Sequence, residues 1–305
     1  MSFKLTILGC SSATPTLLRH SSAQILNVNE RLFLIDCGEG AQIQMRKFHI
    51  KFQRIDHIFI SHLHGDHYLG LMGLLFTFHL LGRTKEVHIY ADSDLKRIID
   101  LQIEISKTTL LYPLIFHSLE GTKTNIVYFD EQVSVTAFPL DHRIPTFGFL
   151  FKEKNKKRKL IKEIISNLDI PLTEFDNIKS GDDFIDLNTG KIYKNDFLTT
   201  AGAPPVSYAY CSDTGYTESY LDTIKGVNLL YHEATFMQDK LKNAREKFHC
   251  TAIDAANIAS KADVCKLMLG HYSARYDDLE PLLNEAKSVF ENTFLAEEGI
   301  ETIII

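Results

Sequence analysis

The residues best suited to chemistry form one short run, Ser61-His62-Leu63-His64-Gly65-Asp66-His67, directly after an apolar segment that predicts a buried strand. In an extended backbone, residues two apart face the same side, so His62 and His64 can bind one metal ion while Leu63 turns toward the core. The glycine that follows permits a tight turn, which can bring Asp66 and His67 toward a second ion. Imidazole and carboxylate groups suit zinc or a similar divalent cation, and two such ions can hold an attacking hydroxide and a phosphoryl oxygen together.

Three more polar residues follow apolar runs in the same way, and they are His142, Asp213 and His271. If the preceding runs are strands that end at one edge of a sheet, these side chains complete a metal site there. The residues alone leave open whether they are ligands or surface groups. The other histidines are interpreted as surface or satisfied core residues, and they are His20, His49, His57, His79, His88, His117 and His232.

Alternating strands and helices must position these residues. Short apolar runs bounded by turn residues predict strands at 5–8, 23–28, 31–36, 57–60, 87–91, 133–137, 147–151, 207–211, 228–231 and 266–269. Helical periodicity predicts helices at about 68–81, 251–261 and 277–290. Strands and helices mix along the whole chain, which favours the α/β class.

Composition excludes several classes of protein. With 305 residues, 45% of them hydrophobic, the chain can fill a large core, and its net charge of −6 means that any nucleic-acid contact must be local. The five cysteines have no C-x-x-C spacing, which favours reduced thiols in a cytoplasmic protein. The N-terminus has no signal-peptide pattern, and the longest apolar run, 68–82, is too short for a membrane span and predicts a buried helix.

The stretch at about 152–200 differs from the rest and predicts an inserted arm within a single domain of residues 1–305. It opens with a basic run opposed only by Glu153, namely Lys152, Lys154, Lys156, Lys157, Arg158, Lys159 and Lys162. This run can contact phosphates or form a solvated charged face, and the sequence does not decide between the two.

The H-x-H-x-D-H run resembles the metallo-β-lactamase superfamily, whose fold is a four-layer αβ/βα sandwich with a metal pair at one edge of two facing sheets. Within that superfamily the chain resembles the ribonuclease Z family over most of its length. The matching elements are Asp36-Cys37-Gly38-Glu39-Gly40-Ala41-Gln42, Ser212-Asp213-Thr214, His232-Glu233-Ala234-Thr235, His249-Cys250-Thr251-Ala252 and His271-Tyr272-Ser273-Ala274-Arg275-Tyr276. The loop Pro15-Thr16 with Arg19 and Ser21-Ser22 also matches, although His20 stands where the family has asparagine.

The resemblance implies a zinc-dependent endoribonuclease that cuts the 3′ trailer from precursor tRNA and leaves a 3′-hydroxyl on the tRNA. It implies that His62, His64 and His142 hold one zinc ion. It implies that Asp66, His67 and His271 hold the other, with Asp213 between the two ions. It also implies a homodimer in which the arm of one subunit helps to hold the tRNA of the other.

The resemblance further implies three catalytic residues, in which Asp66 orients the attacking hydroxide and Glu233 orients His249 as a proton donor to the leaving oxygen. Without the resemblance, the segment around His249 predicts only a helix start at Thr251. The arm departs from the family because Ile170-Pro171 replaces its Gly-Pro pair. Two alternatives remain: another hydrolase of the same fold, such as a lactonase, glyoxalase II or arylsulfatase, and an RNA-binding protein that has lost catalysis.

Overall fold

Two seven-stranded sheets form the centre of the structure, a computed structural model that describes residues 3–305. The first sheet has the spatial order β20 (Glu301–Ile303), β1 (Phe3–Gly9), β3 (Ala23–Val28), β4 (Arg31–Cys37), β5 (Ile55–Phe59), β6 (Val87–Ala91) and β7 (Leu114–Ser118). The second has the order β19 (Thr293–Leu295), β17 (Leu267–Gly270), β16 (Leu229–Glu233), β15 (Ser207–Cys211), β10 (Thr146–Glu153), β9 (Val133–Leu140) and β8 (Asn125–Phe129). A short pair, β2 (Ser11–Ser12) with β18 (Tyr272–Ser273), is separate from both.

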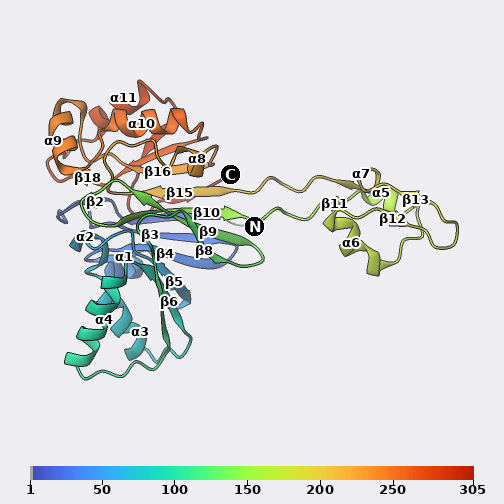
Figure 1. The fold of residues 1–305 in the computed structure, drawn as a ribbon, viewed down its shortest axis with the longest axis horizontal. Helices are drawn as coiled ribbons and strands as arrows, with labels where there is room; N and C mark the ends of the chain where they lie inside the picture. The colour runs from blue at the N-terminus through green and yellow to red at the C-terminus, as the bar shows by residue number, and fades with distance from the viewer. Residues whose placement is uncertain (1–2) are drawn as a thin grey trace. The chain divides into compact units, whose positions relative to one another are not determined.

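Helices cover the outer face of each sheet, so the layers run helix, sheet, sheet, helix (Figure 1). Those of the first sheet are α1 (Ala41–Lys47), α2 (Gly65–Tyr68), α3 (Leu71–Leu80) and α4 (Ser93–Ile105). Those of the second are α8 (Leu221–Ile224), α9 (Leu241–Lys247), α10 (Ala252–Lys261) and α11 (Glu280–Lys287), and short 3-10 segments occupy Phe52–Arg54 and Gln238–Lys240. The predicted α/β class and four-layer sandwich are confirmed.

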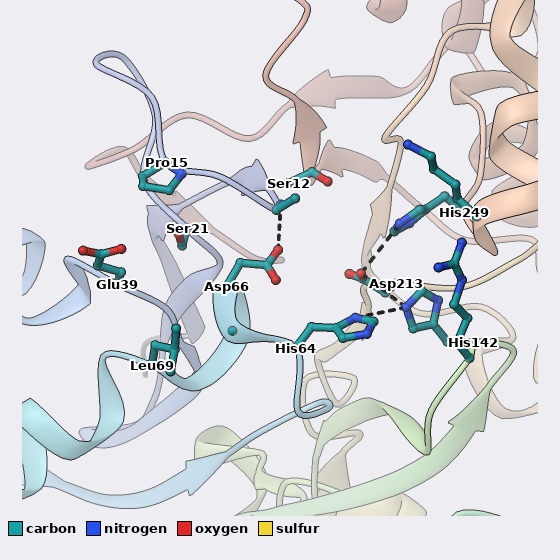
Figure 2. Close-up of a pocket in the computed structure, with 14 residues that line it drawn as sticks. Ser12, Pro15, Ser21, Glu39, His64, Asp66, Leu69, His142, Asp213 and His249 are labelled. Atoms are coloured by element: carbon teal, nitrogen blue, oxygen red, sulfur yellow. Dashed lines mark hydrogen bonds and ion pairs between the residues drawn. The ribbon is translucent and has the colours of Figure 1, made fainter.

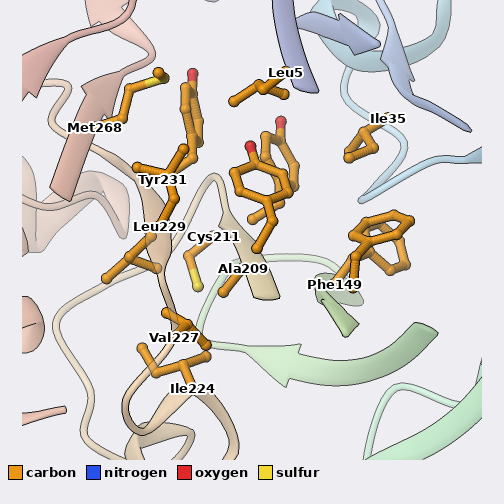
Figure 3. Close-up of a cluster of buried hydrophobic side chains, with 14 of the residues drawn as sticks. Leu5, Ile35, Phe149, Ala209, Cys211, Ile224, Val227, Leu229, Tyr231 and Met268 are labelled. Carbon is orange, nitrogen blue, oxygen red and sulfur yellow. The ribbon is translucent and has the colours of Figure 1, made fainter. Parts of the chain in front are cut away.

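The central strands are buried on both faces because their side chains alternate between two cores. In β4, Phe33 and Ile35 belong to the cluster that includes both sheets, whereas Leu34 belongs to the cluster shared with α1 and α3. Figure 3 shows part of the first cluster, in which Ile35 of the first sheet and Phe149 of the second both take part. Each such side chain contributes about 1.5–3 kcal/mol by leaving water. Polar residues are therefore concentrated where the strands end, which is where the site forms.

The prediction of a buried helix at 68–81 is wrong in two respects, namely where the helix starts and how much of it is buried. It is divided at Gly70 into α2 and α3, because the Gly70 amide donates to the Cys37 carbonyl 2.9 Å away. A side chain at Gly70 would collide with the Gly38 carbonyl, at 2.2 Å. Only one face of α3 is buried, since Leu80 is 79% exposed. Helix α4 was not predicted, although Asp92 caps it by accepting a hydrogen bond from the Asp94 amide.

Residues Glu153–Pro205 form a second compact unit, apart from the unit of Met1–Lys152 and Val206–Ile305. Its elements are β11 (Lys159–Leu160), α5 (Lys162–Ile165), a 3-10 turn (Leu172–Glu174), α6 (Phe175–Ser180), β12 (Phe184–Ile185), β13 (Ile192–Tyr193), α7 (Asn195–Leu198) and β14 (Thr199–Thr200). It has a small core of its own, made of Ile170, Ile178, Phe184 and Leu198. Part of the basic run is ion-paired here, as Lys157 with Asp176 and Arg158 with Asp196 show. That these residues are an arm inserted into one domain stays a prediction.

Three histidines interpreted as structural lie side by side on β5, β6 and β7. His57 stacks on His88 with ring centroids 4.9 Å apart, and His88 Nδ1 lies 2.9 Å from His117 Nε2. Burial and the neighbouring His88 lower the pKa of His57 to about 4. In the unfolded chain the same group titrates near 6.5, so the unfolded state binds more protons between about pH 6.5 and 4. Stability is therefore lost as the pH falls through this window.

We expect His57→Gln to reduce this pH dependence. Between pH 7 and 5 the wild type should lose roughly 2 kcal/mol through His57, and the variant should lose correspondingly less. The measurement is thermal unfolding at both pH values, with chelator in all samples so that metal-binding residues titrate equally in the two proteins. Equal losses of stability in the two proteins would show that His57 does not cause the pH dependence.

Candidate metal centre

The candidate site lies where strands of both sheets end. His62 and His64 follow β5 of the first sheet, whereas Asp213 and His271 follow the parallel strands β15 and β17 of the second. His142 follows β9, a neighbour of β10 in the second sheet. The carboxyl ends of parallel strands meet at one edge, so residues far apart in the chain come together there. Figure 2 shows His64, His142 and Asp213 pointing toward one another.

The first group of possible ligands consists of His62, His64, His142 and Asp213, whose ligand atoms all lie within 4.8 Å of one another. His62 Nε2 is 3.0 Å from His64 Nδ1, which is 3.3 Å from His142 Nε2. Asp213 Oδ2 is 3.6 Å from His62 Nε2. These separations are those of atoms that ligate one ion at bond lengths of about 2.0–2.2 Å.

The second group consists of Asp66, His67 and His271. Asp66 Oδ2 lies 3.4 Å from His67 Nε2 and 3.5 Å from His271 Nε2. Asp213 also reaches this group, since its Oδ1 lies 3.2 Å from His67 Nε2 and 3.0 Å from His271 Nε2. The two oxygens of Asp213 therefore face different groups.

The residues present fit a pair of cations. The Nε2 atoms of His67 and His271 are buried and have no hydrogen-bond partner, which is costly unless they ligate an ion. Asp66 and Asp213 converge on the same nitrogens, so cations would also compensate their buried negative charge. Burial lowers the pKa of His62 well below its usual value, which keeps the imidazole neutral as metal binding requires.

Outer hydrogen bonds hold the imidazole rings in place. His67 Nδ1 donates to Asp36 Oδ2 at 2.7 Å, His142 Nδ1 donates to the Phe248 carbonyl at 2.9 Å, and His271 Nδ1 donates to Thr235 Oγ1 at 2.9 Å. Each bond leaves the opposite nitrogen, Nε2, directed at the ligand cluster.

Sequence reasoning missed two of these supporting residues, Asp36 and Thr235. Asp36 is fully buried and also accepts hydrogen bonds from the Ser61 amide and hydroxyl and from the Tyr210 hydroxyl. The sequence did contain a signal for Asp36, because this residue lies at the end of an apolar strand, much as Asp213 follows one. Thr235 carried no comparable signal.

Glu233 and His249 form a buried pair beside the ligands. His249 Nδ1 donates to Glu233 Oε1 at 2.8 Å, and His249 Nε2 lies 3.9 Å from Asp213 Oδ2. Burial alone would lower the pKa of His249, but the Glu233 carboxylate outweighs it and raises the pKa to about 9. His249 also forms a third possible ligand group with Asp213 and His271, although its bond to Glu233 favours a paired role. The helix start expected at Thr251 is confirmed, since Thr251 Oγ1 accepts from the Asp254 amide.

A pocket of about 390 Å³ opens over the candidate ligands. Pro15, Leu69 and Glu39 line one side, and His142 and His249 line the opposite side (Figure 2). Two cations, Arg143 and Lys247, also line the pocket. On the floor, Asp66 Oδ2 accepts a hydrogen bond of 2.7 Å from the Ala13 amide.

Comparison with known proteins identifies the family. Ribonuclease Z of Bacteroides fragilis (strain YCH46) is 47% identical over 298 residues, which cover 98% of each chain. The chain belongs to the ribonuclease Z family. Ribonuclease Z of Porphyromonas gingivalis (strain W83) is 45% identical and covers 97% of each chain. A family model described as anti-Pycsar protein Apyc1 matches residues 3–154.

Solved structures agree with this assignment. The short form of human tRNase Z is 27% identical, with a TM-score of 0.73 over 99% of each chain. A metallo-β-lactamase fold protein from Bacillus subtilis, YhfI, has a TM-score of 0.70 at 17% identity, covering 99% of this chain and all of that one. Membership of the ribonuclease Z family, the metallo-β-lactamase fold and the prediction of a metal-dependent hydrolase are thereby confirmed.

Proposed function

We propose that the protein removes the 3′ trailer from precursor tRNA by hydrolysing one phosphodiester, with two zinc ions as its cofactor. As a ribonuclease Z, it is an endoribonuclease that acts on tRNA 3′ ends. The observation that carries the proposal of two ions is Asp213, whose two oxygens face separate groups of histidines.

Each group of the site then has a role in the proposed reaction. When bound, the two ions supply Lewis acidity, which activates a water molecule and stabilises the charge that develops on the phosphate. Asp66, held by the Ala13 amide, orients the attacking water. As the bond between phosphorus and the 3′ oxygen breaks, His249 donates its proton to that oxygen and Glu233 stabilises the imidazolium. The tRNA leaves with a 3′-hydroxyl, and the phosphate stays on the trailer.

The first test is cleavage of a 3′-extended precursor tRNA, mapped to single-nucleotide resolution, with and without a chelator. We expect one metal-dependent cut just 3′ of the discriminator base, and about two zinc ions per subunit by elemental analysis. A lactone and a thioester serve as control substrates and should not be turned over. Tight tRNA binding without metal or cleavage would support the non-enzymatic alternative and overturn the proposal.

A homodimer is also proposed, on the basis of exposed apolar side chains around α3 and α4. Leu80, Leu101 and Ile105 are 79%, 56% and 71% exposed, and covering them in a dimer would remove their apolar surface from water. We expect light scattering to give a dimer for the wild type and a monomer for Leu101→Lys combined with Ile105→Lys. A monomeric wild type at micromolar concentration would contradict this.

The cellular location stays a prediction. Within residues 3–305 no helix combines the length and the apolar character that crossing a membrane requires. The cytoplasmic location expected from the sequence is compatible with this finding, and fractionation of cells that produce the protein would test it.

A further inference from the structure

Two cations that line the site pocket take no part in the candidate metal centre or in proton transfer. Arg143 and Lys247 both line this pocket, and both are exposed to solvent. Neither belongs to a group of possible metal ligands, and no carboxylate among residues 3–305 pairs with either of them. The carboxylate of Glu246, which adjoins Lys247 in the chain, lies 3.9 Å from Lys242 instead. Both positive charges are therefore free to attract an anionic ligand.

The end of α9 places both cations beside a candidate metal ligand. The Arg143 guanidinium donates to the Glu246 carbonyl at 3.2 Å, which is a favourable contact for a cation at the end of a helix. His142 Nδ1 donates to the Phe248 carbonyl at 2.9 Å, and Lys247, the last residue of α9, lies between these two acceptors in the chain. A guanidinium has five N–H donors, so most of those of Arg143 remain available to a ligand.

The two cations belong to the side of the pocket that carries the candidate proton donor. His249 follows Lys247 by two residues, and its ring lies 5.3 Å from that of His142, the chain neighbour of Arg143. Glu39 lines the opposite side, as Figure 2 shows. One side of the pocket is therefore positively charged, whereas the other carries a carboxylate. A guanidinium together with an ammonium group is well suited to bind a phosphate, because both donate charge-assisted hydrogen bonds to its oxygens.

We propose that Arg143 and Lys247 bind the phosphate on the 5′ side of the last nucleotide that stays on the tRNA. This rests on the proposed function, in which His249 donates its proton to the 3′ oxygen of that nucleotide. The ribose then lies beside His249, and its 5′ phosphate follows along the strand on the same side of the pocket. Contacts to phosphate position a nucleic acid without reading its sequence. This contact therefore determines which phosphodiester lies over the metal ligands, whatever the base.

The first test measures the binding of trimmed tRNA, which ends in a 3′-hydroxyl and lacks both the cleaved phosphate and the trailer. Arg143→Gln combined with Lys247→Gln should raise its Kd about tenfold. The slope of log Kd against log salt concentration should become shallower by about 0.7, the value for one single-strand phosphate. Lys247→Gln alone, which breaks no hydrogen bond within residues 3–305, should raise Kd about threefold.

The matched control is Arg46→Gln combined with Lys47→Gln. It removes two exposed cations from the last turn of α1, outside the pocket, and should leave Kd within about twofold of the wild type. An equal rise in Kd in the control would show a general electrostatic attraction and overturn the proposal. An unchanged Kd in the variants at Arg143 and Lys247 would also overturn it, because these cations would then contact the cleaved phosphate or the trailer.

A second measurement identifies the phosphate in precursor cleavage. An uncharged methylphosphonate on the 5′ side of the last retained nucleotide should raise the wild-type KM about as much as the double variant does, with little change in kcat. The two changes together should cost little more than either alone, whereas a methylphosphonate within the trailer should add fully to the effect of the variant. Independent effects at the retained phosphate would overturn the assignment. A wild type that does not cleave the unmodified precursor would instead reject the proposed function, so the two failures are distinguishable.

Discussion

Asp213→Ala is expected to abolish zinc binding at both sites together with cleavage of precursor tRNA. Asp213 is buried, and each of its two oxygens lies close to a different ligand group. Loss of a supporting partner of a metal ligand typically costs 10–100-fold, so loss of the shared ligand should cost at least about 10³-fold in kcat/KM. Elemental analysis should show zinc falling from about two per subunit to below one.

Asp141→Asn is the matched control, because Asp141 is exposed and adjoins His142 in the chain but belongs to none of the ligand groups. It should keep its zinc and most of its activity. His64→Ala is a milder case, which should lose metal and activity while most of the fold stays intact. Retention of two zinc ions by Asp213→Ala, or unfolding of His64→Ala at room temperature, would refute this account of the ligands.

Glu233→Gln is expected to lower kcat by about 10²-fold or more and to change its pH dependence. The Glu233 carboxylate holds the pKa of His249 above its ordinary value, and burial opposes this effect. Without the carboxylate, the pKa of His249 must fall. A proton donor works only while it is protonated, so the activity of the variant should decline at lower pH than that of the wild type. A metal ion bound to Asp213 would lower the pKa of His249 in both proteins. The pKa of His249 would still be lower in the variant than in the wild type.

A second glutamate–histidine pair, more exposed than the first, supplies the control. Glu298 accepts a hydrogen bond of 2.8 Å from His20 Nδ1, outside the pocket, so Glu298→Gln should cost less than tenfold in kcat and should not move the pH profile. The measurement is single-turnover cleavage between pH 6 and 10 with saturating zinc. If the alkaline limb of Glu233→Gln coincides with that of the wild type, His249 is not the proton donor.

The sequence determined much of this protein through local patterns. The run from Ser61 to His67 combines ligand types with a two-residue spacing, and strand geometry alone then directs His62 and His64 to one side. The strands predicted at 23–28 and 31–36 pair as a hairpin, because Asn29 and Glu30 between them adopt the positive φ that a tight two-residue turn requires. The start of α10 at Thr251 also followed from a local capping preference.

The tertiary structure decided which distant residues meet. Periodicity does not decide whether His142, Asp213 and His271 are ligands, because it does not reveal which strands are neighbours or that they end at one edge. The contact of Asp36 with His67 and the division of the helix at Gly70 depend on a close approach of β4 and the segment after β5. The hydrogen bond from His142 to the Phe248 carbonyl also joins distant parts of the chain, and it forms only once α9 lies beside the end of β9.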